Sequence, residues 1–491
     1  MKMETKLNKY SARAYLRFVV YSMIGVFAFF INFTMPGYQI NIGPWQWGAV
    51  AAQSNVLVSH FTNFVKAALY TGNLNAMPFV VWAFGVYSII DLFWLRPDRF
   101  WKTTKIAAIF AVFKLIGFGL LTVSVLNIYF GYNPGWMAWY LEPVASLGGK
   151  SIASFIMGNI LVSICISIPA ASLFLPFLVD YGLVDFVGVF VRPIMRPVFK
   201  LPGRAAVIAV SAFLGSFSVG HIATNDQYKT GRMNTKESVI ICTSLSTASV
   251  GFLLVLANNT GLTNSNLWGQ SYWNMYFWVA FIITMLVTLI GVRIPPLSKT
   301  SEAFYPGVTP NPEQVVREDL FKTAWKEGLD MAENQQSLFK RIGIIMEETF
   351  LMMGTVASGT AFFGALGVVL YTFTPIIGWI GYLFRPLFML FGFTGEELAV
   401  AATGTVISFV EITVPALLVS VGEWSMRLRF MLAVLPVTSI IFLASFVPCL
   451  MATDVPVTFG EMCIIWLERM IISILITGLF AVILFPAGMV A

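Results

Sequence analysis

Leu183-Val-Asp-Phe-Val-Gly-Val-Phe-Val-Arg-Pro193 matches a later stretch of the same chain, Ile376-Ile-Gly-Trp-Ile-Gly-Tyr-Leu-Phe-Arg-Pro386. Glycine, arginine and proline are identical in three aligned pairs: Gly188/Gly381, Arg192/Arg385 and Pro193/Pro386. A second match places Thr247-Ala-Ser-Val-Gly-Phe-Leu253 over Val437-Thr-Ser-Ile-Ile-Phe-Leu443. Duplicated halves in an apolar chain are typical of secondary transporters, in which the repeats enclose a substrate site.

The composition indicates a membrane protein. The chain has 491 residues, of which 58% are hydrophobic and 11% charged. Several apolar stretches exceed the roughly 18 residues that can cross the hydrocarbon core. Although the net charge is +6, the basic residues lie in short loops between apolar stretches. Loops of this kind orient a protein in the bilayer, so membrane lipid and not nucleic acid is the expected partner.

The hydropathy pattern predicts an all-α polytopic membrane protein with about nine transmembrane helices. The predicted spans are 15–36, 76–95, 106–129, 151–179, 236–257, 271–292, 347–373, 430–452 and 463–487. Two weaker apolar pieces, 204–223 and 396–422, are broken by Gly, Ser and Thr. If each enters and leaves on one face, most Lys and Arg sort to one side. We therefore predict two re-entrant hairpins, a cytoplasmic N-terminus and a multi-pass position in a bacterial inner membrane.

The chain divides into four predicted regions: scaffold helices at 1–150, a first repeat at 151–292, a cytoplasmic linker at 293–346 and a second repeat at 347–491. An odd number of crossings separates the two repeats, so the second is expected to be inverted relative to the first. The scaffold includes an external stretch at 37–75 and is a candidate contact in a homo-oligomer. In the linker, Asn311-Pro312 is a plausible start for an amphipathic helix.

Hairpin one reads Ser211-Ala-Phe-Leu-Gly-Ser-Phe-Ser-Val-Gly220. Backbone that is not helical at membrane depth needs partners from protein, water or ligand. Ser216 and Ser218 are therefore candidate ligands of a polar solute. The alternative is that Gly and Ser simply allow close helix packing.

Hairpin two reads Thr403-Gly-Thr-Val-Ile-Ser-Phe-Val-Glu-Ile-Thr-Val-Pro415. Glu411 is the only acid between Glu397 and Glu423, and an unpaired carboxylate at mid-bilayer costs about 2.5–3.5 kcal/mol. It must pair, bind a solute or cation, or stay protonated. The candidate solute ligands of this hairpin are Thr405, Ser408, Glu411 and Thr413. The alternative for Glu411 is a structural ion pair with Arg427 or Arg429.

The span after hairpin one contains Thr243-Ser-Leu-Ser-Thr-Ala-Ser249, and its counterpart contains Pro436-Val-Thr-Ser439. Hydroxyls can bend a helix or, together with carbonyls that a break or a proline frees, bind a cation. The candidate cation ligands are Thr243, Ser244, Ser246, Thr247, Ser249 and Ser439. Hydrogen bonding between helices is the alternative.

The remaining charged residues and the histidines give weaker indications of a functional site. Glu468 and Arg469 are expected within about one turn of a span end. The chain has only two histidines, so a multi-histidine metal centre is excluded. Neither a nucleophile with a base nor a pair of acids is evident, so we predict no enzyme activity and no cofactor.

The segments Gly215-Ser-Phe-Ser, Met233-Asn-Thr-Lys-Glu-Ser-Val and Ser246-Thr-Ala-Ser-Val-Gly251 resemble the nucleoside-recognition (Gate) domain. That domain occurs in concentrative nucleoside transporters, and the whole chain resembles the YjiH-type bacterial branch. The resemblance covers about 150–290 well and 347–487 more loosely. It implies that Glu411 matches a glutamate that contacts solute, and that 243–249 matches a broken span that helps hold Na+. The transporters' Gln and Glu in hairpin one are replaced here by Ser216-Phe-Ser218, so base recognition does not carry over.

Taken together, these patterns predict a secondary transporter of a small polar solute, such as a nucleoside, an amino acid or a small peptide, coupled to Na+ or H+. The solute would lie between the hairpin tips. A Gate-domain protein that does not transport, and acts instead as an assembly or signalling partner, is the alternative.

Overall fold

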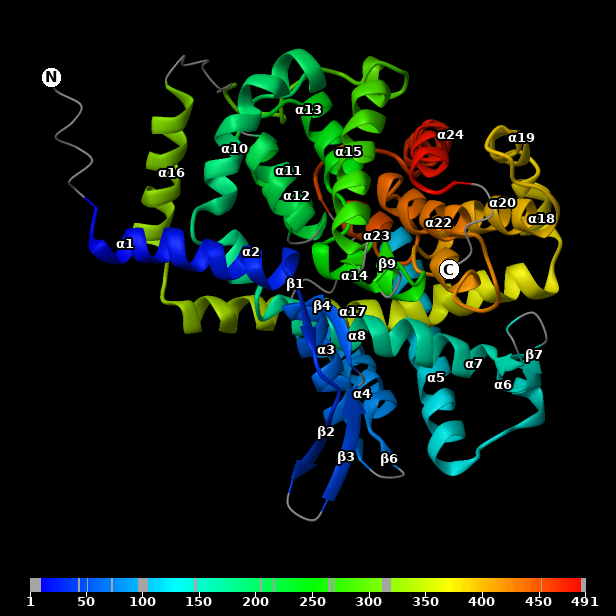
Figure 1. Ribbon diagram of the computed structural model, residues 1–491. Coiled ribbons are helices and arrows are strands. Elements are labelled where there is room, and N and C mark those ends of the chain that lie inside the picture. The colour runs from blue at the N-terminus through cyan, green and yellow to red at the C-terminus, as the bar shows by residue number, and fades with distance from the viewer. Residues whose placement is uncertain are drawn as a thin grey trace, which may run out of the picture.

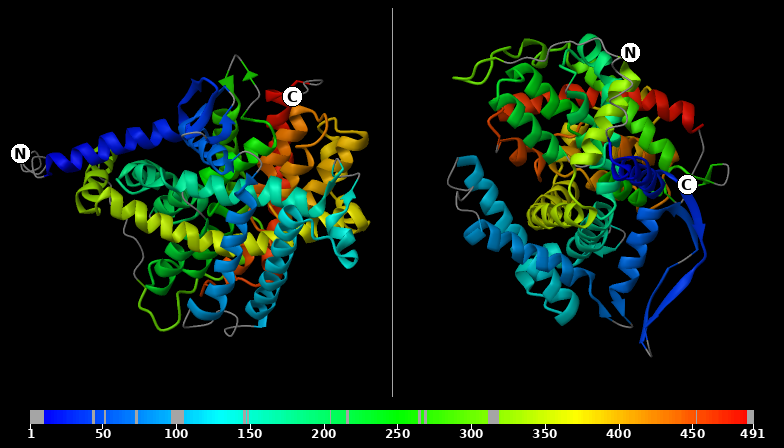
Figure 2. Two further views of the ribbon diagram at one scale, coloured as in Figure 1. Left: turned by 90° about the horizontal axis from the view of Figure 1, so that it is seen from below. Right: turned by 90° about the vertical axis from the view of Figure 1, so that its left-hand side faces the viewer.

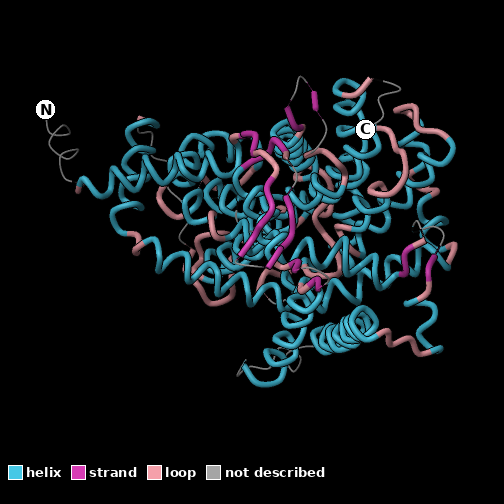
Figure 3. The backbone as a smooth tube through the Cα atoms, turned by 60° about the horizontal axis from the view of Figure 1, so that its bottom comes forward, coloured by secondary structure: helices cyan, strands magenta, loops and turns pink. Residues whose placement is uncertain are grey.

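The computed structural model describes residues 10–42, 45–50, 52–71, 74–95, 105–144, 147, 149–203, 205–214, 217–263, 266–267, 270–310, 319–451 and 453–486. Helices dominate these residues, and the strands form short pairs and one small four-stranded sheet (Figure 3). Seven described helices are long and apolar enough to cross a membrane: Ala12–Phe30, Met77–Trp94, Ala108–Phe130, Thr235–Asn259, Trp273–Gly291, Val356–Phe373 and Phe459–Leu484. The protein is therefore a helical, polytopic membrane protein, as predicted.

Three of the nine predicted spans are interrupted. One, 236–257, is interrupted at residues 246–249, between η9 (Ile241–Leu245) and α14 (Val250–Asn259). Another, 151–179, is helical through α7 (Ile152–Phe155), η7 (Ile156–Leu161) and α8 (Val162–Ser172), and then turns before α9 (Leu175–Val179). The third, 430–452, is divided into α22 (Met426–Thr438) and α23 (Phe446–Met451). Pro436 lies in the last turn of α22, where it removes a backbone donor and favours the end of the helix.

The N-terminal region contains more than the predicted scaffold helices. Its helical elements are α1 (Ala12–Leu16), η2 (Arg17–Tyr21), α2 (Ser22–Phe30), α3 (Leu57–Ala68), α4 (Met77–Ile90), η3 (Asp91–Leu95), α5 (Lys105–Phe130), η5 (Gly135–Met137) and α6 (Ala138–Leu141). Its strands are β1 (Asn32–Met35), β2 (Tyr38–Ile42), β3 (Trp45–Val50), β4 (Gln53–Val56), β5 (Tyr70–Thr71), β6 (Leu74–Asn75), β7 (Pro143–Val144) and β8 (Lys150–Ser151).

The strands were not predicted, although alternation of polar and apolar residues at 38–42 is the period of a strand. β2 and β3 pair antiparallel, within a sheet of order β2-β3-β5-β6. They project from the helical body (Figure 1).

The longest helix, α17 (Leu338–Phe373), packs against α4, α5 and α8. In Figure 1 helices α10–α15 of the first repeat and α20–α24 of the second lie on one side of it and α3–α5 on the other, and Figure 2 shows its length from below. A Cβ atom at Gly117 of α5 would lie 1.9 Å from the carbonyl oxygen of Ser358 in α17. Only glycine allows this approach, which is typical of helix packing in membranes.

The same order of elements occurs twice. After α8, the first repeat continues with α9, α10 (Leu183–Ile194), η8 (Met195–Phe199), α11 (Ala205–Leu214), α12 (Phe217–Lys229), α13 (Thr235–Ile240), η9 (Ile241–Leu245), α14 (Val250–Asn259), β9 (Asn266–Leu267), β10 (Gln270–Ser271) and α15 (Trp273–Gly291). After α17, the second continues with α18 (Ile376–Gly381), α19 (Arg385–Met389), α20 (Gly395–Val410), α21 (Val414–Leu418), α22, α23 and α24 (Phe459–Leu484).

The matched glycines perform the same packing role in both repeats. A Cβ atom at Gly188 of α10 would lie 2.8 Å from a Val207 methyl in α11. At Gly381 of α18 it would lie 3.4 Å from the backbone of Ala402 in α20. In each repeat the matched glycine therefore lets the preceding helix lie close against the first helix of the hairpin.

Each predicted hairpin is a pair of helices that fold back on each other. α11 contacts α12, and a Cβ atom at Gly220 would lie 2.8 Å from the Cβ of Ala212. α20 contacts α21 in the same way. Hairpin one extends further than predicted, because α12 continues to Lys229 instead of ending near 223.

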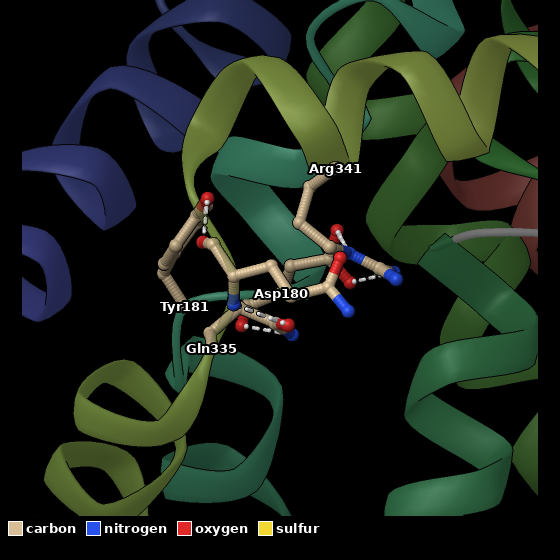
Figure 4. Close-up of polar contacts among 5 residues, drawn as sticks. Asp180, Tyr181, Gln335 and Arg341 are labelled. Carbon is tan, nitrogen blue, oxygen red and sulfur yellow. Dashed lines mark hydrogen bonds and ion pairs between the residues drawn. The ribbon is translucent and has the colours of Figure 1, made fainter.

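The linker connects the repeats through polar contacts. After η10 (Leu297–Lys299), helix α16 (Leu320–Asn334) is capped by Asp319 and packs on α10 and α1, while the predicted start at Asn311-Pro312 lies outside the described residues. Beyond it, the Arg341 guanidinium donates two hydrogen bonds, of 3.0 and 2.8 Å, to Asp180 (Figure 4). Gln335 donates to the Asp180 carbonyl at 3.2 Å. These bonds fix the start of α17 against the first repeat.

Candidate functional site

Glu411 lies where hairpin two reverses. It is the C-cap of α20, just before α21 begins, and its side chain is 1% exposed. Its Oε1 accepts hydrogen bonds from the backbone N–H of Thr413 at 3.1 Å and from the Thr413 hydroxyl at 2.8 Å. Its Oε2 has no partner within hydrogen-bond distance among the described residues, although the Thr360 side chain of α17 lies close enough to act on the carboxyl group. The carboxylate is thus held by its own hairpin with one oxygen available.

This available oxygen belongs to a residue that lines a cavity of about 40 Å³. The lining residues come in corresponding groups from the two repeats: Ile164 and Ile168 (α8) with Met353, Val356 and Thr360 (α17); Phe217 with Glu411 and Ile412 at the hairpins; and Ala248, Ser249 and Phe252 with Ile440, Phe442 and Ser445 at the broken helices. The cavity therefore lies where the repeats meet. Its wall is mostly apolar, with a few polar groups.

The other predicted solute ligands are placed differently. The Thr405 hydroxyl donates to the carbonyl of Ala401 at 2.8 Å, and the Ser408 hydroxyl donates to that of Thr405 at 2.6 Å. Neither residue lines the cavity, because both hydroxyls bond back to their own helix. Ser216 lies outside the described residues, as does the side chain of Ser218 in α12.

The alternative pairing of Glu411 with Arg427 or Arg429 is wrong. Arg427 donates to the carbonyl of Phe485 at 2.5 Å. Arg429 donates to the carbonyls of Trp424, Thr260 and Gly422. Both guanidiniums bond backbone carbonyls, and the salt bridges of the described residues do not include Glu411.

The predicted cation ligands lie at two breaks, 246–249 between η9 and α14, and 439–445 between α22 and α23. The hydroxyls of four are already bonded. Thr243 donates to the carbonyl of Val239, and its hydroxyl lies 3.4 Å from that of Ser244 in a second hydrogen bond. Ser249 accepts from the Phe252 N–H as the cap of α14, and Ser439 donates to the carbonyl of Trp466. Ser246 and Thr247 are fully buried, and neither hydroxyl has a partner within the described part of the chain.

The carbonyls freed by the breaks are bonded by Arg469 of α24. Its Nη2 donates to the carbonyl of Thr438 at 2.6 Å and to that of Ser244 at 3.2 Å. Its Nη1 donates to the Thr288 hydroxyl at 3.2 Å, and that hydroxyl donates to the carbonyl of Ser244 at 2.9 Å. A guanidinium therefore already bonds both of these carbonyls.

Sequence reasoning missed Arg469 because it placed the start of the last span too late. α24 begins at Phe459, so Arg469 lies well inside the helix and not within one turn of its end, and its side chain is 1% exposed. Ten residues of helix are about 15 Å long, half of the hydrocarbon thickness. The pattern Thr458-x-x-Glu461 forms a capping box, and this pattern could have located the helix start.

Comparison with known proteins supports the resemblance found in the sequence. Residues 161–263 match the Gate family, described as nucleoside recognition. An uncharacterized protein of Alkalihalophilus pseudofirmus is 27% identical over 486 residues, which is 96% of this chain and 95% of the relative. The similarity to Gate proteins is thus confirmed over most of the first repeat.

Solved structures of CNTnw also align with the chain. One, in an inward-facing substrate-bound state, has a TM-score of 0.38 and 12% identity, covering 86% of this chain and 95% of that chain. A variant in an outward-facing state has a TM-score of 0.38 and 12% identity, covering 95% and 99%.

Proposed function

We propose that this protein is a secondary transporter of a small polar solute, and that the solute binds beside Glu411 where the two repeats meet. The single observation that carries the proposal is the cavity, to which corresponding elements of both repeats contribute. Inverted-repeat transporters bind solute in this position, between discontinuous helices near the middle of the membrane. A buried carboxylate is costly and adds nothing to the packing of an apolar core, so the unpartnered oxygen of Glu411 supports a role in binding the solute.

The chemistry of the wall limits the solute. Glu411, Thr360, Ser249 and Ser445 are the polar residues of an otherwise apolar lining. A solute with a hydrogen-bond donor or a positive charge at one end and an apolar body would fit this arrangement. Nucleosides, amino acids and small peptides all carry such donors.

The size of the cavity indicates that binding requires motion. About 40 Å³ holds roughly three waters, whereas ligand pockets are typically about 300–1,000 Å³. The solute would therefore enter only when the hairpins separate from α8 and α17. Such opening and closing of a site between repeats is the usual basis of alternating access.

The expected setting is a bacterial inner membrane with the N-terminus in the cytoplasm, because basic loops then lie inside. Na+ or H+ would drive transport, as the family resemblance implies. The exposed apolar residues of α5, among them Ile109 and Val112, suit contact with lipid or with a second copy in a homo-oligomer.

Uptake by proteoliposomes tests the proposal. A panel of labelled nucleosides, amino acids and dipeptides should include a solute that accumulates when a Na+ or H+ gradient is applied. That uptake should be lost in Glu411→Gln. It should be kept in Thr405→Val, because the hydroxyl of Thr405 bonds only to its own helix. If no panel member accumulates, and none raises the melting temperature, the alternative role as an assembly partner is favoured.

A further inference from the structure

Arg469 is a buried positive charge without an acidic partner. Its side chain is 1% exposed and lies far from either end of α24. Among the described residues, no carboxylate lies within salt-bridge distance of it. Its hydrogen bonds go to two backbone carbonyls and one hydroxyl. An intramembrane charge of this kind is costly and usually marks a functional site.

The charge is balanced by helix ends. Ser244 is in the last turn of the helix that runs from Thr235 to Leu245, and Thr438 is the last residue of α22. Each C-terminal helix end carries about half a negative charge. Two such ends together match one guanidinium.

The position of Arg469 also follows from the repeat. Ser244 and Thr438 precede the breaks in corresponding broken helices, one from each repeat. A single guanidinium reaches both, so these two helices end close together. Half-helix C-terminal ends are the groups that hold the coupling cation in transporters of this architecture.

We propose that the Arg469 guanidinium takes the place of a bound metal cation at the junction of the two broken helices, so that the protein does not bind Na+ there. The inference deepens the proposed transport function, since it decides which coupling ion the site can use. Ser246 and Thr247 follow closely after Ser244, whose carbonyl the guanidinium bonds. A Na+ ion at the Ser246 and Thr247 hydroxyls would therefore be repelled by the positive charge of Arg469.

Melting temperatures of the purified full-length protein test this without any solute, so a wrong transport assignment would not affect the result. At constant ionic strength, NaCl replaces choline chloride, and KCl serves as the second salt. An ion that binds only the folded protein raises its melting temperature. Wild type should melt at the same temperature in all three salts. A saturable rise specific to Na+ would overturn the proposal.

Arg469→Gln should melt lower than wild type in choline chloride, because the Thr438 carbonyl loses its guanidinium donor and the Ser244 carbonyl keeps only the Thr288 hydroxyl. NaCl, but not KCl, should restore part of the loss, since the emptied junction can now hold the ion. A loss without restoration by Na+ would show that the guanidinium is only structural, and an unchanged melting temperature would also reject the proposal.

Arg429→Gln is the matched control, because Arg429 also donates to three backbone carbonyls, but in a less buried position. It should melt lower without any Na+-specific gain. Should Arg469→Gln not fold, Arg469→Lys keeps the charge and should stay insensitive to Na+. A Na+-specific gain in Arg469→Lys would count against the proposal.

Discussion

The two repeats share their order of elements but differ in chemistry at the point where they meet. Hairpin two contributes Glu411, a carboxylate with one free oxygen, whereas the described part of hairpin one contributes the ring of Phe217. The breaks differ as well. In the first break two buried hydroxyls have no described partner, and in the second Ser439 is bonded to Trp466. The two copies thus share their packing, while the polar groups at their junction differ.

The largest effect should come from the difference between the hairpins. Replacing Glu411 by Gln removes the only acid of the cavity wall, and we expect solute uptake to fall at least tenfold, by about 1.4 kcal/mol or more in transition-state binding. The melting temperature should not fall, because burying a carboxylate is itself costly. Uptake measured in proteoliposomes checks the change. Uptake at the wild-type rate in this variant would remove the proposed site.

Much of this architecture could be predicted from the sequence, because membrane depth makes departures from apolar helix conspicuous. The Gly, Ser and Thr of 204–223 and 396–422 indicated the hairpins, and Pro436 indicated a break. Glu411 stood out for the same reason. The strands at 32–56 were not predicted for two reasons. The first predicted span was extended to residue 36, although α2 ends at Phe30 and β1 begins at Asn32. Beyond it, polar and aromatic residues outside the spans carry no comparable constraint.

The partners of side chains could not be predicted. Thr405 and Ser408 carry hydroxyls that could bind a solute, but both hydroxyls donate to carbonyls of their own helix. Whether a hydroxyl bonds in this way depends on the local backbone geometry, which the sequence does not give. Arg469 was misjudged because an error of a few residues in a helix start moves a charge by several ångströms along the membrane normal.

The second effect compares the matched glycines. Gly188→Ala should destabilise by about 1–3 kcal/mol, because its methyl would lie 2.8 Å from Val207 and force a shift in packing. Gly381→Ala should cost less, since its methyl would make ordinary contact at 3.4 Å. Thermal unfolding of both variants in the same detergent measures the difference. Equal losses would mean that the two interfaces are packed alike.

A smaller effect separates the breaks. Ser439→Ala removes a hydrogen bond to the Trp466 carbonyl and should lower stability by about 1 kcal/mol. Thr247→Val removes a buried hydroxyl without a described partner, so stability should stay constant or rise. If that hydroxyl contacts the solute, Thr247→Val should nevertheless slow uptake. A loss of stability in Thr247→Val matching that of Ser439→Ala would show that the first break is bonded as fully as the second.

The smallest expected effect on stability concerns the polar contacts that attach each hairpin to the rest of the protein. Glu397 in hairpin two accepts a hydrogen bond from Ser425 of its own repeat, whereas Lys229, at the end of α12 in hairpin one, pairs with Asp454 of the other repeat at 3.0 Å. The Lys229 ammonium lowers the pKa of the Asp454 carboxyl below its usual value. A lowered folded-state pKa stabilises the protein above the ordinary pKa of about 3.9, and this contribution is lost as pH falls through the folded-state value.

Because both partners are about half exposed, Asp454→Asn should lower the melting temperature only slightly at pH 7. The gap between wild type and variant should narrow as pH falls towards 3 and as salt is added, since protonation and screening remove the same attraction. Lys322, which pairs with Asp319 in the linker, offers a control at a bridge that does not join the repeats. A gap for Asp454→Asn that persists in acid and in high salt would point to the hydrogen bond that the Asn225 amide donates to the Asp454 side chain, and not to the charge of Asp454, as the contact that joins the repeats.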